Sequence, residues 1–361
     1  MTAVGDRGRT SLGAVLTLLH RDGAASRADL TQATGLNRST IALVVADLVA
    51  RGLAVESDAL AHGRVGRPSP QVSAAPDAAV LAVNPELDAL TVGVVGFGAR
   101  VLELHRLPAR LDPADAVAAI ADLARSRRLL GIGAAVPGLV GPGGTVRWAP
   151  HLEWRDVPFA AMLAEATGLP AVAANDAHSA ARAEHLFGAG QGHDDLVFLN
   201  GGSSGIGGAV IAGGRLLTGT RGFTGEFGHN RVDGLELEQA VGRDRLLAVL
   251  GLGPETDEAT LGLALASSAD PAVTAEIAAQ QAVLAQGIAN AVNVLDPGVV
   301  VLGGFLAALL DDGLRSSVRG LALAQEPEPT RLAAAALAED RILIGAAEAA
   351  LAAVLTDPAA A

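Results

Sequence analysis

Two short polar stretches of this 361-residue chain carry residue types that can do chemistry. The stretch TGEFGHN sets the carboxylate of Glu226 and the imidazole of His229 among glycines. Asn175 and Asp176 form a second polar pair, where an apolar strand pattern gives way to a helical one. A carboxylate accepts hydrogen bonds from two neighbouring hydroxyls, and Asn and His both donate and accept, so these groups match a sugar diol. A metal ligand beside an acid, a polar turn and a helix N-cap pair remain alternatives.

The expected position of Asp176 bears on its charge. The residue falls at the start of a helix, where the backbone N–H groups and the helix dipole favour a negative charge. The sequence therefore predicts an ionised carboxylate at this position.

The composition excludes several classes of protein. The chain has no cysteine, which excludes disulfides and thiolate metal sites. It has no apolar run of the roughly 18 residues that a membrane span needs, and no apolar stretch behind a basic N-terminus. The length predicts two domains, and the net charge of −13 argues against binding nucleic acid or anionic lipid over the whole surface. We therefore expect a cytoplasmic protein without a membrane partner.

Charge is distributed unevenly along the chain. Residues 1–75 hold eight Arg and six acidic residues, a net charge of +2, whereas the remainder has a net charge of −15. Such an asymmetry suggests that only the front segment meets a polyanion.

Residues 1–75 predict a winged helix-turn-helix domain. Ser26 and Asp29 form a capping-box start for a second helix, Gly35 ends that helix in a tight turn, and Asn37 caps a third helix. LAVES and the residues after it predict a two-stranded flap. The buried stripes of the first and third helices are Leu12, Val15, Leu16 and Leu19, and Ile41, Val44, Val45 and Leu48.

The third helix would enter the major groove of double-stranded DNA by its N-terminal end. That end is polar and suits base edges or phosphates, and two arginines in the flap could reach a phosphate or the minor groove. Helix capping by the same polar residues is the alternative. Because winged-helix proteins bind paired half-sites, a homodimer or higher homo-oligomer is expected. The predicted DNA-binding residues are Asn37, Arg38, Ser39, Thr40, Arg64 and Arg67.

Residues 76–361 predict a second domain, in which strands alternate with helices as is typical of an α/β fold. Residues 195–217 read as a glycine-rich hairpin, and the buried strand PGVVVLGG comes later. Residues 271–295 and 339–355 predict long helices. Two halves that each open with a glycine-bearing hairpin predict two lobes with a cleft between them.

Five stretches of this domain, in this order, resemble the ROK proteins (repressors, open reading frames and sugar kinases): GIGAAVPGLV, ANDAHSAARAE, GGSSGIGG, TGEFGHN and VVVLGG. The resemblance covers about residues 79–356, and the winged helix in front resembles the regulator branch of the family. It implies an actin-like, two-lobed fold of the sugar-kinase type, with the sugar in the interlobe cleft. NDA, GExGH and the glycine hairpin are specific together, although each is weak alone.

The resemblance also implies roles for the polar residues. In ROK kinases the Asp of ND takes the proton from the sugar hydroxyl, so Asp176 is the general base if the chain is a kinase. Asn175, Glu226 and His229 would hold the sugar hydroxyls, and the segment LELEQAVG adds Glu238 to them.

Other positions follow from the same motifs. Gly138 and His151 are further candidates for sugar contact, and His151 stands where the family usually has Asn, which leaves the identity of the sugar open. Any nucleotide would lie against Gly205, Gly207, Gly303 and Gly304.

Two departures from the family pattern bear on function. The His of GExGH usually binds a structural zinc with three cysteines, and a chain without cysteine cannot complete that site around His229. We expect no metal, and a loop NRVDGLELEQ that is held by packing. ROK kinases also begin the domain with an Asp-x-Gly-x-Thr type of turn, whereas Asn84 and Pro85 stand there in this chain and the glycines are missing. A Mg²⁺ partner and close backbone approach to phosphates are lost, so we expect neither ATP nor Mg²⁺ as a cofactor.

The sequence therefore predicts a sugar-responsive, DNA-binding transcriptional regulator, a repressor, with a non-catalytic ROK domain. Its partners would be a DNA operator and a monosaccharide effector, and no catalytic residue is expected. Two alternatives remain: an ATP-dependent sugar kinase of the ROK family, and a DNA-binding regulator whose ROK domain is only a dimerisation or protein-docking scaffold.

Overall fold

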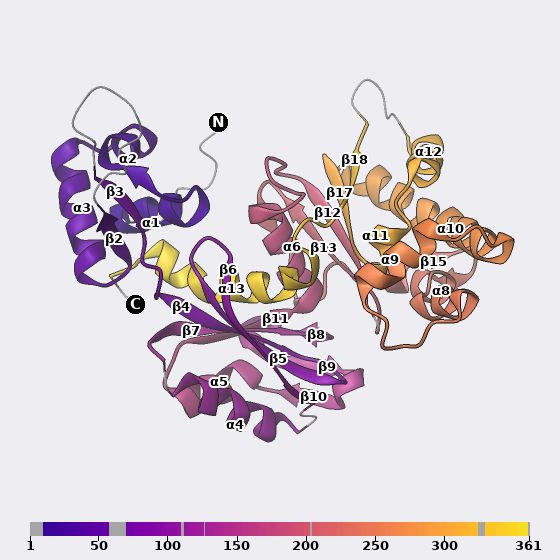
Figure 1. Ribbon diagram of the computed structural model, residues 1–361, viewed down its shortest axis with the longest axis horizontal. Helices are drawn as coiled ribbons and strands as arrows, with labels where there is room; N and C mark the ends of the chain where they lie inside the picture. The colour runs from indigo at the N-terminus through magenta and orange to yellow at the C-terminus, as the bar shows by residue number, and fades with distance from the viewer. Residues whose placement is uncertain are drawn as a thin grey trace. The chain divides into compact units, whose positions relative to one another are not determined.

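The computed structural model describes residues 10–57, 70–109, 112–125, 127–202, 204–323 and 329–359. Contacts within the chain divide it into two compact units, Met1–Ala174 with Leu343–Ala361, and Asn175–Ile342 (Figure 1). The N-terminal helices and the first α/β lobe thus share one unit, and the boundary expected between residues 75 and 76 falls inside it. The boundary between a DNA-binding domain and a sugar-binding domain at residues 75 and 76 stays a prediction.

The described residues open with three helices, as the sequence predicted, and the second and third form a helix-turn-helix pair. The second and third helices are bent by 112° relative to each other, within the range of helix-turn-helix pairs. The strands β1, β2 and β3 form a sheet in the order β1-β3-β2. The elements are α1 (Ser11–Arg21), β1 (Ala25–Ser26), α2 (Arg27–Thr34), α3 (Arg38–Ala50), β2 (Ala54–Ser57) and β3 (Gln71–Ala74).

Local signals set the ends of these helices. The Asp29 N–H donates to Ser26 Oγ at 3.1 Å, and the Ser26 N–H donates to Asp29 Oδ2 at 3.0 Å, which closes the capping box. Gly35 ends α2 with a φ of 70°, a conformation that favours glycine. Asn37 Oδ1 accepts from the Thr40 N–H at 2.9 Å and caps α3. Both predicted helix starts are confirmed.

The first lobe is built on a five-stranded sheet in the order β11-β7-β4-β5-β6. The helices α4 (Pro113–Ala124) and α5 (Phe159–Thr167) pack against each other and close an apolar core that includes Trp154. A small second sheet, β8 to β10, was not predicted. The strands are β4 (Ala79–Pro85), β5 (Ala89–Gly96), β6 (Arg100–Pro108), β7 (Leu129–Val136), β8 (Leu139–Val140), β9 (Val146–Ala149), β10 (Trp154–Val157) and β11 (Ala171–Asn175), with the 3-10 turns η1 (Pro142–Gly144) and η2 (Pro150–Leu152).

The last helix, α13 (Arg341–Thr356), packs on the same sheet. A side chain at Gly133 of β7 would overlap the Ala346 carbonyl, so the glycine lets the helix backbone approach the strand. At its other end, α13 meets the start of α1, where the Thr10 N–H donates to the Thr356 carbonyl at 3.2 Å.

A buried polar link joins α1 to this helix and to the sheet. His20 Nδ1 accepts from the Gly98 N–H at 3.0 Å, and His20 Nε2 lies 3.1 Å from Glu348 Oε2. Because Nδ1 accepts, Nε2 carries the proton and donates to the carboxylate. The helix-turn-helix, the first sheet and α13 are therefore fastened together inside one unit.

The second unit has a five-stranded sheet in the order β14-β13-β12-β17-β18. Alternate residues of the central strand point to two cores: Val197 and Leu199 to a cluster with α10, and Leu196 and Phe198 to a cluster with α6. The elements are α6 (Asp176–Phe187), β12 (Leu196–Gly202), β13 (Gly205–Ala212), β14 (Arg215–Leu216), η3 (Phe227–His229), β15 (Arg231–Val232), β16 (Leu235–Glu236), α7 (Leu237–Ala240), α8 (Arg243–Leu250), α9 (Glu258–Ser267), α10 (Pro271–Leu295), β17 (Val299–Gly304), α11 (Phe305–Ala308), α12 (Asp312–Leu321), β18 (Arg331–Ala334) and η4 (Ala338–Asp340).

Within the described ranges, no single helix is long and apolar enough to cross a membrane, and only α2 and α3, taken together as a bent pair, meet that length and composition.

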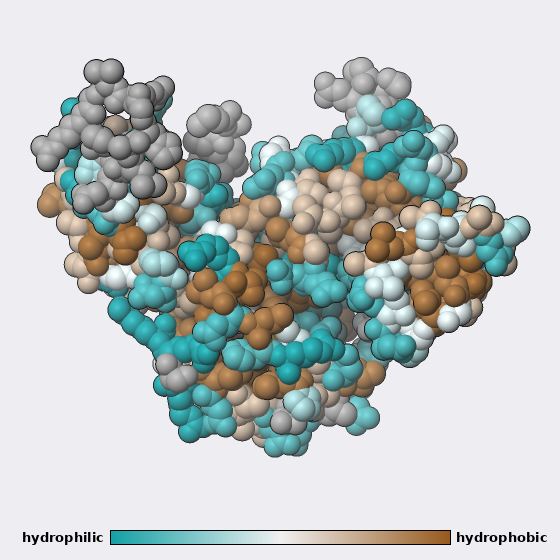
Figure 2. Space-filling model, in the orientation of Figure 1, coloured by the Kyte–Doolittle hydropathy of each residue, from teal (hydrophilic) through white to brown (hydrophobic). Residues whose placement is uncertain are grey.

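Hydrophobic and hydrophilic residues are interspersed over the face that Figure 2 shows. The exposed large hydrophobic residues include Leu43 on α3 and Leu263 on α9, each 73% exposed. These two side chains are open to contact from outside the chain.

Candidate functional site

The TGEFGHN stretch forms a tight turn beside β13. The Phe227 N–H donates to the Gly225 carbonyl at 2.7 Å, and the Asn230 N–H donates to the Phe227 carbonyl at 3.0 Å. Gly225 has a φ of 95°, which glycine adopts without strain. The turn leaves Glu226 half-buried and His229 exposed.

Asn175 and Asp176 lie at the start of α6. Asn175 Oδ1 accepts from the His178 N–H at 3.0 Å, so the N-cap role that the sequence left open is confirmed for this residue. His178, for which the sequence predicted no role, links the helix to the turn: its buried Nε2 lies 2.6 Å from the Thr224 carbonyl oxygen. Burial lowers the pKa of His178, so the neutral imidazole donates to that carbonyl. His178 therefore positions the turn relative to Asn175 and Asp176.

The glycine-rich hairpin of β12 and β13 packs against both pieces. A Cβ at Gly208 would lie 2.5 Å from Phe227 Cδ2, and a Cβ at Gly207 would lie 3.0 Å from the Ala177 Cβ. A Cβ at Gly205 would overlap the Glu238 carboxylate. Because carbon atoms that are not bonded pack at about 3.5–4.0 Å, side chains here would displace the turn, the helix or Glu238. The glycines let the pieces of the candidate site lie close together.

The charge of Asp176 depends on this packing. Burial raises the pKa of Asp176 to about 6, against the effect of hydrogen bonds from backbone N–H groups. The negative charge of Glu226 raises it further, and Arg341 lowers it. The helix start alone suggested the opposite direction, and the loss of solvent outweighs it. A carboxylate with a pKa near 6 can accept a proton near neutral pH, which is the property of a general base.

Glu226 is subject to the same forces. Burial raises the pKa of Glu226, the nearby His229 lowers it, and Glu238 raises it. Glu226 lies close enough to Asp176 to raise its pKa and is itself affected by His229 and Glu238, so the second unit brings these predicted residues near Glu226.

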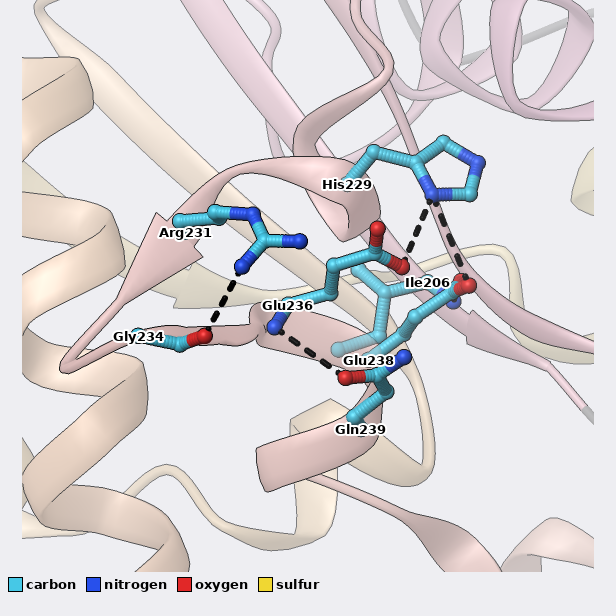
Figure 3. A network of polar contacts seen from close by, with 7 residues as sticks. All are labelled: Ile206, His229, Arg231, Gly234, Glu236, Glu238 and Gln239. Atoms are coloured by element: carbon cyan, nitrogen blue, oxygen red, sulfur yellow. Dashed lines mark hydrogen bonds and ion pairs between the residues drawn. The ribbon is translucent and has the colours of Figure 1, made fainter.

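His229 faces two carboxylates, those of Glu236 and Glu238, with a single ring nitrogen (Figure 3). Its Nδ1 is 3.3 Å from Glu236 Oε2 and 3.7 Å from Glu238 Oε1. The hydrogen bond with Glu236 raises the pKa of His229, partial burial opposes this, and the surrounding carboxylates reinforce it. The Ile206 N–H donates to Glu238 Oε2 at 3.3 Å and holds that carboxylate against the hairpin. The cluster can both donate to and accept from neighbouring hydroxyls. The sequence predicted no role for Glu236, and only the structure shows that it belongs to this cluster.

The segment after His229 is a two-stranded hairpin, β15 and β16, with Arg231 opposite Glu236. Asp233 and Gly234 form its turn with φ values of 50° and 86°, as the Asp-Gly pair of a type I′ turn requires. Val232 is buried in the apolar core of this unit. The loop is held by packing and by its turn, as the sequence predicted.

The same cluster offers ligand atoms for a cation. Atoms of His229, Glu236 and Glu238 lie within 4.8 Å of one another. Structural zinc takes four nitrogen or sulfur ligands, whereas this group supplies one imidazole and two carboxylates at a largely open position. The residues do not fit a structural zinc. That the chain binds no metal stays a prediction.

The two remaining candidates for sugar contact, Gly138 and His151, lie in the first unit. Gly138 has a φ of 136°, and a side chain there would overlap the Trp148 carbonyl, so this position requires glycine for backbone packing. His151 is exposed in η2. Both belong to the first unit, whereas the other five sugar candidates belong to the second. Their contact with a sugar stays a prediction.

Asn84, in place of the kinase aspartate, lies near the end of β4 and opposite Thr91. It is buried, and its Oδ1 has no hydrogen-bond partner in the part of the chain that the structure describes. The strand then turns back through a hydrogen bond from the Glu86 N–H to the Ala89 carbonyl at 2.7 Å. Residues 84–89 contain no glycine, and Leu87 is exposed at the turn. The bare backbone that a phosphate needs for close approach is missing.

The glycines named for a nucleotide are crowded by protein atoms. A Cβ at Gly303 would lie 2.7 Å from Asn200 Oδ1, and one at Gly304 would overlap the Gly201 carbonyl; Gly205 and Gly207 contact Glu238 and Ala177 in the same way. A pocket lies beside Gly304, and its ionisable lining residues are all acidic: Glu258, Glu339 and Asp340. Glu258 is paired with Arg341 at 2.9 Å, and the negative charge of Glu339 and Asp340 disfavours a phosphate.

The N-terminal end of α3 carries the predicted DNA contacts. Arg38 and Ser39 are exposed and Thr40 is half-buried. Asn37 Oδ1 accepts from Ser39 Oγ at 2.6 Å and from Thr40 Oγ1 at 3.0 Å, so helix capping is confirmed for Asn37. Arg38 is left as the charged side chain at this end. Arg64 and Arg67 lie outside the described residues.

A helix-turn-helix pair lies ahead of an actin-like, two-lobed domain, a fold that solved structures of regulators and sugar kinases share. The model of the ROK family matches residues 89–353. The chain belongs to the ROK family.

Its relatives include both kinases and repressors. The glucokinase of Streptomyces coelicolor is 29% identical over 298 residues, which cover 72% of this chain and 93% of that protein. The xylose repressor of Caldicellulosiruptor bescii is 23% identical over 333 residues, 81% of this chain and 83% of that protein. The solved structure of a ROK family transcriptional regulator, a homologue of the E. coli MLC protein, is 24% identical, covers 96% of both chains and superimposes with a TM-score of 0.76. At this identity the structural likeness establishes the fold.

Proposed function

We propose that this chain is a sugar-responsive transcriptional repressor that binds an operator through its helix-turn-helix and a monosaccharide through its ROK domain. The observation that carries the proposal is the combination, in one chain, of a helix-turn-helix with a polar cluster at the start of α6 and in the TGEFGHN turn. A kinase would need the second feature and not the first. The similarity to a xylose repressor over 81% of the chain supports the combination.

The proposed sugar site comprises Asn175, Asp176, Glu226, His229 and Glu238. Adjacent hydroxyls of a pyranose each donate one hydrogen bond and accept another. Glu226 and Glu238 supply acceptors, and His229, with its raised pKa, supplies a donor. Burial, and to a lesser extent the Glu238 carboxylate, raise the pKa of Glu226, and bound hydroxyls that donate to Glu226 stabilise its negative charge.

We infer that the domain binds sugar without phosphorylating it. Asn84 replaces the acidic Mg²⁺ partner, the turn at residues 84–89 lacks glycine, and the pocket beside Gly304 is lined by acids. Phosphoryl transfer depends on placing phosphate and metal, so a remaining base does not suffice.

The course of α13 supports coupling between sugar and DNA. The helix begins at Arg341, the division between the two units falls between residues 342 and 343, and its last turns pack on α1. A change at the sugar site that bends or shifts this helix reaches the helix-turn-helix through the buried His20 and Glu348. Sugar and operator affinities must then change by the same factor in either direction.

One observation favours a sugar kinase as the second candidate. The pKa of Asp176, about 6, suits a general base, and glucokinases are among the relatives. This candidate predicts transfer of phosphate from ATP to a sugar, and Asp176→Asn would abolish it.

Calorimetry with common aldoses and amino sugars, run beside a coupled assay for ADP release, separates these functions. We expect a binding isotherm for one sugar, its loss in Glu226→Ala and no ADP release. Glu255→Ala, which removes an exposed carboxylate of the same unit, is the matched control and should bind as wild type does. ADP release that depends on Asp176 would favour the kinase, and no isotherm with any sugar would leave the domain as a scaffold.

A further inference from the structure

The exposed face of α3 carries a stripe of mostly small and apolar side chains. Ile41, Val44, Val45 and Leu48 face the core, whereas the opposite stripe is exposed. That stripe follows the spacing i, i+4, i+7, i+11 and consists of Ser39, Leu43, Ala46 and Ala50. Leu43, one turn after Ser39, is its one large side chain and is 73% exposed.

An exposed leucine by itself is ordinary on a protein surface, and its position is what matters here. Leu43 lies on the exposed stripe of the second helix of the helix-turn-helix pair, between the Ser39 hydroxyl and the methyl groups of Ala46 and Ala50. Ala46 and Ala50 add little bulk, so a surface can approach this stripe closely. The flanking Asp47 is paired with Arg51 at 3.0 Å, which offsets the acidic charge beside the stripe.

The surroundings favour nucleic acid as the occupant. Arg38 is exposed at the N-terminal end of α3, and residues 1–75 carry a net charge of +2 in a chain of −13. In the major groove of DNA, the apolar group on a base edge is the C5-methyl of thymine, and apolar side chains recognise it by contact.

Resting on the proposed DNA-binding function, we propose that Leu43 contacts the C5-methyl of a thymine in each operator half-site, so that α3 selects an A·T pair there by apolar contact. Ser39 and Arg38 lie N-terminal to Leu43 and meet the neighbouring base edges or phosphates. Leu43 is then a residue that determines sequence specificity, while Arg38 supplies affinity.

The test removes one methyl group at a time. The operator is first selected from a random duplex library with the full chain, and its binding is measured by fluorescence anisotropy. Each thymine is then replaced by deoxyuridine, which keeps every hydrogen-bonding group and lacks the methyl. A replacement in one half-site should weaken wild-type binding about fourfold, the value expected for one buried methyl. The same replacement should leave Leu43→Ala unaffected.

Leu263→Ala is the matched control, since Leu263 is equally exposed and lies on α9 of the other unit. It should retain the full response to deoxyuridine. If no duplex is selected at physiological salt, the proposed function itself fails. If a duplex is selected but no deoxyuridine weakens wild-type binding, or the loss is the same in Leu43→Ala, the role of Leu43 is refuted. A fall in the association state of Leu43→Ala without DNA would assign the residue to contact with a second copy and would also overturn the proposal.

Discussion

The substitution Gly208→Ala tests whether close packing at the glycine-rich hairpin keeps the residues of the candidate sugar site in place. A Cβ at this position would lie 2.5 Å from Phe227 Cδ2 and 2.9 Å from the carbonyl oxygens of Gly225 and Phe198. Phe227 and its turn must therefore move by about 1 Å to reach normal contact distances. Overpacking of this kind costs about 1–3 kcal/mol, and replacing glycine returns about 0.4–1 kcal/mol through the unfolded chain. The net loss for Gly208→Ala is about 1–2 kcal/mol.

The assay must report on the second unit. Both tryptophans, Trp148 and Trp154, belong to the first unit, so fluorescence does not follow the hairpin. Hydrogen exchange of the β12 and β13 amides gives the opening free energy directly, and we expect Gly208→Ala to lower it by the amount above. Sugar affinity should fall about tenfold or more, because Glu226 and His229 move with the turn.

Gly202→Ala is the control within the same hairpin, because the nearest atom to a Cβ there is 3.9 Å away. It should stay within about 0.5 kcal/mol of wild type and keep its sugar affinity. Equal exchange and equal sugar binding in Gly208→Ala and Gly202→Ala would refute the packing explanation. A glycine requirement that appeared only with ATP would assign the hairpin to nucleotide binding instead.

Three further predictions concern charge and metal. Because the pKa of Asp176 is raised from 3.8 to about 6, the folded state holds this proton more tightly, and stability falls as the pH rises from about 4 to 6. Asp176→Asn should remove that pH dependence and stabilise the second unit by about 1–3 kcal/mol at pH 7, as measured by hydrogen exchange. Calorimetry should show that the variant no longer binds the sugar. A more stable wild type at pH 7 than at pH 5 in this unit would contradict it. Glu348→Ala leaves the Nε2–H of His20 buried without its acceptor and should cost about 2–4 kcal/mol in unfolding followed by Trp154 fluorescence, and Glu348→Gln, which keeps an acceptor, should cost clearly less. Dialysis against a chelator should leave the melting temperature and sugar binding unchanged, and a loss restored by Zn²⁺ would show that the cluster around His229 is a metal site.

Local signals in the sequence were sufficient for the helix ends and for the family. Ser26, Gly35 and Asn37 act on the backbone within a few residues, so their roles could be read directly. The ordered ROK motifs likewise predicted the two-lobed fold, which the family match and the structural likeness confirm.

Contacts between distant segments could not be read in the same way. His20 and Glu348 are 328 positions apart, and nothing near either residue indicates the other. His178 follows the NDA motif but becomes informative only when Thr224 lies beside it. The net direction of the Asp176 pKa shift depends on burial, which the sequence does not give, and the helix start indicated only the opposing contribution of the backbone N–H groups. The glycines of the hairpin suggested phosphate binding as one use, whereas their packing partners appear only in three dimensions.

Sugar-responsive operator binding is tested most directly by a fluorescence anisotropy titration of the full chain with its upstream promoter fragment, at physiological salt, with and without the sugar found by calorimetry. The proposed function predicts specific binding that the sugar weakens, and no response to the sugar in Glu226→Ala, which should still bind the fragment. Absence of specific binding, or binding that the sugar changes equally in wild type and Glu226→Ala, would contradict it.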